Sequence, residues 1–68
     1  MVNPITSRQL AILQFLAKHP GVDRELLART TLAAPGDMAY LMDNDLMRER
    51  TGGHCHISHF GELVLKRS

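Results

Sequence analysis

The segment "LMRERTGGHCHIS", residues 46–58, decides the fold of this chain because it predicts a β-hairpin. If the loop held only the two glycines, arginines would oppose Cys55 and Ile57 on the apolar face, which is costly. A three-residue loop that ends with Gly53 in the left-handed conformation pairs Met47 with Ile57 instead. We therefore predict the three-residue loop, with the apolar pair inside and the basic residues outside.

This register places two cross-strand pairs on the outward side of the hairpin, Arg48 with His56 and Arg50 with His54. We call these four side chains the basic hairpin face. Gly52 and Gly53 form the flexible tip beside it. Arginine suits a phosphate backbone or a narrow minor groove, and the same face would also suit an acidic protein surface.

The hairpin and the residues after it are rich in metal-ligand types, since three of the four histidines and the single cysteine lie within residues 51–62. The predicted register separates them, because His54 and His56 point outward beside arginines whereas Cys55 points inward. A structural zinc site uses four ligands, and neighbouring arginines disfavour a second cation. We therefore expect no metal site.

Catalytic chemistry has no supporting pattern in this sequence. Cys55 is expected to serve as a small apolar residue, and no histidine shares its side of the strand to activate a thiolate. Ser58 is better explained as a helix cap than as a nucleophile. Paired carboxylates, a serine triad and a phosphate loop are all missing, so we expect neither an enzyme nor a cofactor.

Outward from the hairpin, hydrophobic spacing and capping signals predict helices over residues 6–21, 22–31, 35–44 and 59–67. The fold class is therefore mainly α with a small β-hairpin: three helices, the hairpin and a short C-terminal helix. Helix starts are marked by a Thr6–Gln9 capping box, by Asp23, by Pro35 and by Ser58. The inward residues are expected to be Leu10, Ile12, Leu13, Leu16, Ala17, Leu26, Leu27, Met38, Leu41, Met42, Phe60, Leu63 and Val64.

Size and composition indicate one small domain over residues 1–68, with an apolar fraction of 44% and a formal net charge of +1. A chain of this length buries only about 60% of its unfolded surface, so a partner subunit is one way to complete its core.

The lone cysteine suits a reducing compartment. The N-terminal "MVNPITS" lacks a signal peptide's basic and apolar parts, and no run could span a membrane, so we expect a cytoplasmic protein.

The order of elements, with these residues, resembles the winged helix-turn-helix core of MarR and ArsR type bacterial regulators. "ITSRQLAILQFLAKHPGV" is similar to their opening helix, and "DRELLARTTLAAPGDMAYLMDNDLMRER" resembles their helix-turn-helix with the first wing strand. "CHISHFGELVL" resembles their Ile-x-Leu-Thr-x-x-Gly ending, where Ser58 matches the capping hydroxyl and Gly61 the glycine. The resemblance spans residues 5–65, and it implies that residues 35–44 enter the major groove of DNA.

The composition of that recognition segment departs from what DNA reading requires. No Lys or Arg occurs from Thr30 to Met47, and three Asp do. Affinity for DNA comes mostly from cations that replace phosphate counterions, so carboxylates on the docking side oppose it. Its outward residues Asp37 and Tyr40, with Asn44 at the end, are nevertheless the candidates for base contact.

Two functions follow as hypotheses. The first is a small DNA-binding transcriptional regulator, similar to those of phages and mobile elements. It would contact double-stranded DNA through the basic hairpin face and glycine tip, and through Arg24, Arg29, Asp37, Tyr40 and Asn44. The second is a winged-helix protein-interaction module or inhibitor that binds an acidic or mixed-charge protein and does not read DNA. A homodimer would use the core surface, the N-terminal arm or the last helix.

Overall fold

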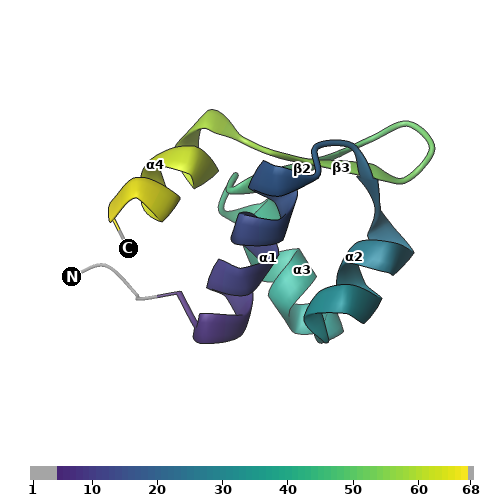
Figure 1. Ribbon diagram of the computed structural model, residues 1–68, viewed down its shortest axis with the longest axis horizontal. Helices are drawn as coiled ribbons and strands as arrows, with labels where there is room; N and C mark the ends of the chain where they lie inside the picture. The colour runs from purple at the N-terminus through teal and green to yellow at the C-terminus, as the bar shows by residue number, and fades with distance from the viewer. Residues whose placement is uncertain (1–4, 68) are drawn as a thin grey trace.

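The computed structural model describes residues 5–67 of the chain. Four helices and a small antiparallel sheet make up the molecule, and α1 lies at its centre (Figure 1). The fold is therefore mainly helical, as predicted, and its layout is compatible with a winged helix. The elements are α1 Ser7–Lys18, β1 Val22–Asp23, α2 Arg24–Thr31, α3 Pro35–Asp43, β2 Met47–Arg50, β3 His54–Ile57 and α4 His59–Arg67.

The sheet has three strands in the order β1-β3-β2, so the predicted hairpin is only part of it. β1 pairs Val22 with Cys55 and Asp23 with His54. We predicted a helix within residues 22–31 with Asp23 as its N-cap, and α2 does begin after that cap, at Arg24, but the strand formed by Val22 and Asp23 was not predicted. A strand of two residues is too short to produce a periodic pattern, and only the pairing partner across the sheet defines it.

The predicted helix caps are confirmed. The Thr6 hydroxyl accepts from the Gln9 amide at 3.0 Å, and the Gln9 side chain accepts from the Thr6 amide at 3.0 Å. The Asp23 carboxylate accepts from the first amides of α2, and Pro35 occupies the first turn of α3. Ser58 Oγ accepts from the Gly61 amide at 2.9 Å at the start of α4. Each element therefore starts where its local chemistry directs it.

The core gathers side chains from every helix except α4 and from both strands of the hairpin. The predicted inward positions of α1 and α3 supply most of it, whereas Leu10, Met42 and Val64 are only partly buried and four other expected residues are exposed. Leu26 is 51% exposed, Phe60 54% and Leu63 38%, and Ala17 is also exposed. The buried apolar residues are Ile12, Leu13, Leu16, Leu27, Met38, Leu41, Leu46, Met47 and Cys55.

These exposures have a common cause in how few neighbours cover each helix. α2 buries Leu27 against α1, whereas the adjacent Leu26 is covered only by about half. α4 meets the core through Gly61, with Val64 and Leu65 partly buried against it, so its other side stays open. Amphipathic spacing predicts an apolar stripe, but a small domain has too few elements to cover every stripe.

Candidate nucleic-acid interface

The register of the hairpin confirms the predicted sorting of side chains. Arg48 pairs with His56 and Arg50 with His54, so the four residues of the basic hairpin face share one side of the sheet. The loop has the predicted three residues, and both of its glycines adopt positive φ, +90° at Gly52 and +80° at Gly53. The two-glycine loop is excluded, because it would shift each of these pairs by one residue.

The two histidines lie against the turn that leads into β1. His54 Nδ1 is 3.1 Å from the Gly21 carbonyl oxygen, which requires a proton on that nitrogen and leaves Nε2 directed elsewhere. A Cβ added to Gly21 would lie 3.6 Å from the His56 ring, so this ring packs close to the same turn. Packing against Gly21 thus holds both rings in place on the basic hairpin face.

The two hairpin arginines differ in their partners. Arg48 forms a two-pronged ion pair with Asp45, at 3.1 and 3.4 Å, and both side chains are more than half exposed. Within residues 5–67 the guanidinium of Arg50 has no ion-pair or hydrogen-bond partner. Arg50 is therefore the cation of the face that is free to bind an anion, whereas Arg48 must exchange Asp45 for it.

The helix-turn-helix arginines that we predicted to hold phosphates are also paired. Arg24 Nη1 lies 3.1 Å from Glu49 Oε1, which joins the start of α2 to the middle of β2. Arg29 lies 3.9 Å from Glu25 one turn away on α2, where both side chains are about four-fifths exposed. An exposed pair of this kind is weak and exchanges readily with a phosphate, so neither contact prevents DNA binding.

The α3 candidates have intramolecular roles that sequence reasoning missed. The Asp37 carboxylate accepts from the Ala34 amide at 3.1 Å and from Gln9 Nε2 at 3.4 Å, so it caps its own helix. Tyr40 is half-buried against the core rather than outward. Asn44 Nδ2 donates to the Tyr40 carbonyl at 2.8 Å. The structure thus leaves these three side chains less available to base edges than we expected.

The ligand-type residues stay apart. In the described part of the chain, no three His, Cys, Asp or Glu side chains gather closely enough to hold a metal ion. Cys55 is fully buried, and burial, reinforced by the Glu49 carboxylate, raises the pKa of its thiol. A protonated buried thiol is a poor nucleophile and a poor ligand.

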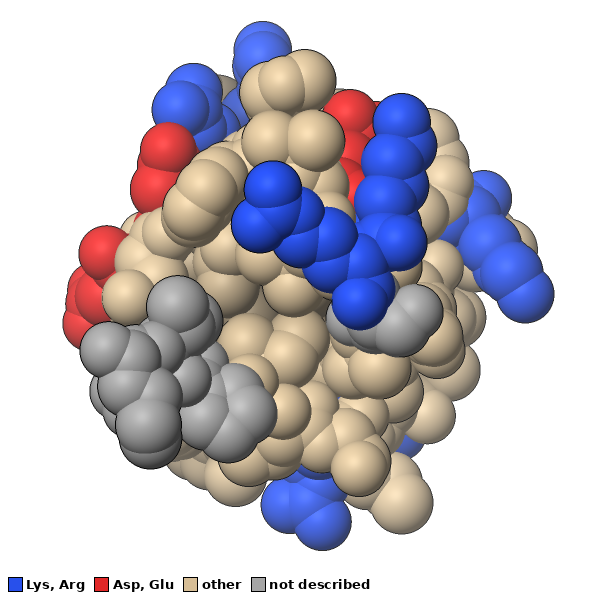
Figure 2. Space-filling model, turned by 90° about the vertical axis from the view of Figure 1, so that its left-hand side faces the viewer, with Lys and Arg blue, Asp and Glu red and all other residues tan. Residues whose placement is uncertain are grey.

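A second set of cations lies at the opposite end of the molecule from the hairpin loop. α4 ends with Lys66 and Arg67. Figure 2 views this end and shows Lys and Arg side chains near its middle, with Asp and Glu toward the left and upper margins. The positive charge of the protein is therefore distributed over both ends and is not confined to the hairpin.

Comparison with known proteins adds no family to this description. No protein-family model matches the chain, and no curated protein matches it as a relative. None of the helices described within residues 5–67 has the length and apolar character needed to cross a membrane.

Proposed function

We propose that this protein is a small DNA-binding transcriptional regulator of the winged-helix type, similar to MarR and ArsR regulators and acting in the cytoplasm. The single observation that supports it most is the register of β2 and β3. That register brings Arg48, Arg50, His54 and His56 onto one side of a hairpin with a flexible glycine tip. A narrow hairpin with cations on one side fits a DNA groove and its phosphates.

In this proposal the backbone phosphates supply most of the affinity. Arg50 binds a phosphate directly, and Arg48 and Arg24 exchange their carboxylate partners for phosphate oxygens when DNA arrives. Base reading through α3 is weak, because α3 contains no Lys or Arg and its Asp37 is engaged as a cap. The expected binding is therefore strongly salt-dependent and only modestly sequence-specific.

Fluorescence anisotropy with a labelled mixed-sequence duplex over a series of salt concentrations tests the proposal. Arg50→Ala is expected to reduce the slope of log affinity against log salt by about 0.9, the value for one phosphate contact. Arg67→Ala is the matched control, since it removes the same charge from the far end of α4. Absence of duplex binding at low salt, or an equal loss in both variants, would refute the proposal.

A second candidate, a protein-interaction module that does not read DNA, is favoured by one observation. α3 has no basic residue, and its exposed side presents the Asp43 carboxylate while Asp37 is engaged as a cap, so this side suits a mixed-charge protein surface better than it suits DNA. Affinity capture with the wild-type chain and with Asp43→Lys tests it, with Glu62→Lys on α4 as the control. A captured protein that is lost in the first variant alone supports this candidate. Homodimerisation stays a prediction, and the molar mass measured by light scattering tests it.

A further inference from the structure

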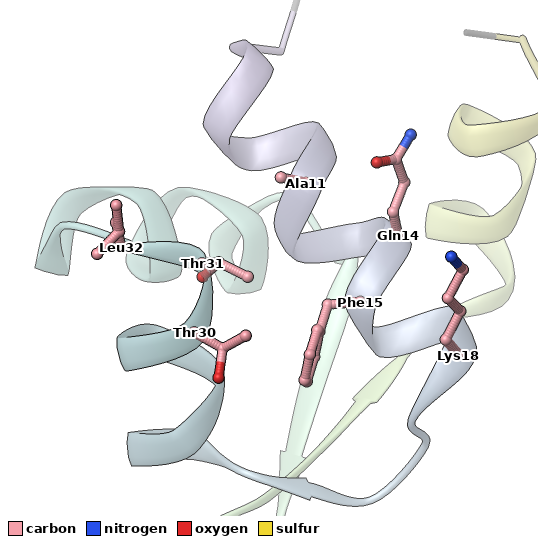
Figure 3. A pocket seen from close by; sticks show the side chains of 7 residues that line it. All are labelled: Ala11, Gln14, Phe15, Lys18, Thr30, Thr31 and Leu32. Carbon is pink, nitrogen blue, oxygen red and sulfur yellow. The ribbon is translucent and has the colours of Figure 1, made fainter.

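A shallow groove runs between α1 and the end of α2, away from the basic hairpin face. Its volume is about 360 Å³, and it is lined on one side by Ala11, Gln14, Phe15 and Lys18, which follow one another along α1. The other side is formed by Thr30 and Thr31 at the end of α2 and by its C-cap residue Leu32. Figure 3 shows Phe15 between the two helices, with Leu32 and Lys18 at opposite ends of the lining. No residue of the basic hairpin face takes part.

Leu32, at the edge of the groove, has an unfavourable backbone conformation that lowers the stability of the fold. It is 77% exposed, and it adopts the left-handed conformation with φ of 57° at the C-cap of α2. The left-handed conformation is energetically unfavourable for an L-residue with a Cβ, and glycine or asparagine usually occupies this position. A large apolar side chain that is both strained and exposed contributes little to stability, so a binding role is the better explanation.

The charge around the groove indicates what fills it. α1 contains no Asp or Glu, and it has Arg8 in its first turn and Lys18 in its last. Lys18 lines the groove, and no carboxylate does. Arg8 lies outside the lining and pairs with Asp37 at 3.9 Å, so Lys18 is the cation that the groove offers. A second copy of this chain that docked through the same lining would bring no carboxylate to Lys18, which favours an acidic partner over self-association here.

We propose that this groove binds an acidic amphipathic helix of a partner protein. Apolar side chains of that helix lie against Phe15 and Leu32, and a carboxylate of the helix pairs with Lys18. An apolar helix face laid into a groove between two helices is a common mode of peptide recognition. The interaction is independent of the proposed DNA contact, because the two surfaces share no residue.

Titration of the isotope-labelled protein by NMR, with a short helical peptide as the probe, tests this inference. The peptide has leucines along one face and glutamates at both ends, and the matched peptide has lysines in place of the glutamates. The acidic peptide is expected to shift the backbone amides of Ala11, Phe15 and Leu32 in a saturable way. The lysine peptide is expected to bind about two- to fivefold more weakly, as loss of one partly exposed ion pair implies.

Two variants separate binding from folding. Leu32→Asn is expected to weaken the acidic peptide about tenfold through lost apolar contact. The same change should raise the melting temperature, since asparagine tolerates the left-handed conformation. Leu26→Asn is the control, because it removes a half-exposed leucine of α2 outside the groove lining. Lack of saturable shifts, shifts at α4 or the hairpin instead, or equal loss in both variants would overturn the inference.

Discussion

Gly61 is the point at which α4 rests on the remainder of the fold. It lies in the first turn of the helix and is buried. A Cβ added there would overlap the Leu46 carbonyl oxygen and would lie 2.8 Å from Ile57 Cγ1. The Leu46 oxygen cannot move away without disturbing the hydrogen bond that it accepts from the Ser58 amide at 3.1 Å. Glycine is needed here for close approach of the backbone, and not for an unusual φ.

The cost of Gly61→Ala follows from these contacts. Overpacking against a fixed backbone costs about 1–3 kcal/mol, and disturbing the Ser58–Leu46 hydrogen bond adds about 1 kcal/mol. Alanine returns about 1 kcal/mol through its higher helix propensity. We therefore expect the free energy of unfolding to fall by about 1–3 kcal/mol. A domain of this size has about 3–10 kcal/mol in total, so the melting temperature should fall by about 5–20 °C.

Urea and thermal unfolding followed by circular dichroism measure this change. Gly36→Ala provides a matched control, because no heavy atom lies within 4 Å of a Cβ at that position in α3. The control is expected to gain up to about 1 kcal/mol from helix propensity. If Gly61→Ala lowers the free energy of unfolding by less than about 0.5 kcal/mol, the close packing of α4 on Leu46 does not hold this helix in place.

Three other predictions concern the hairpin and the start of α4. Ser58→Ala removes a hydroxyl that donates to a carbonyl and accepts from the Gly61 amide, so urea unfolding should show a loss of about 2 kcal/mol. Arg24→Ala removes the phosphate contact that Arg24 is proposed to make when it exchanges Glu49, so it should reduce the slope of log affinity against log salt by about 0.9, and an unchanged slope would exclude Arg24 from phosphate contact. Cys55 should resist a thiol reagent until the chain unfolds. Because its raised pKa keeps the folded thiol protonated where the unfolded one ionises, stability should fall above about pH 8.5 in the wild type and not in Cys55→Ala.

The candidate site could be predicted in its layout but not in its charge balance. Alternation along the hairpin predicts that two arginines and two histidines share a side, because successive strand residues point to opposite faces. The Asp45–Arg48 pair lies three residues apart, so its partners are close in the sequence itself. The Arg24–Glu49 pair joins residues 25 apart in sequence and depends on how α2 meets β2, so no local pattern contains it.

The sequence by itself determined the starts of the helices, the loop length and the register of the hairpin. These follow from interactions among near neighbours: a hydroxyl and an amide three residues apart at Thr6 and Ser58, and glycines that accept positive φ. Only the tertiary structure decided that Val22 and Asp23 form a strand, that Leu27 is buried while Leu26 is exposed, and that Asp37 of α3 accepts a hydrogen bond from Gln9 of α1. Burial and strand pairing depend on which distant element arrives alongside, and that is a property of the packed chain and not of its local pattern.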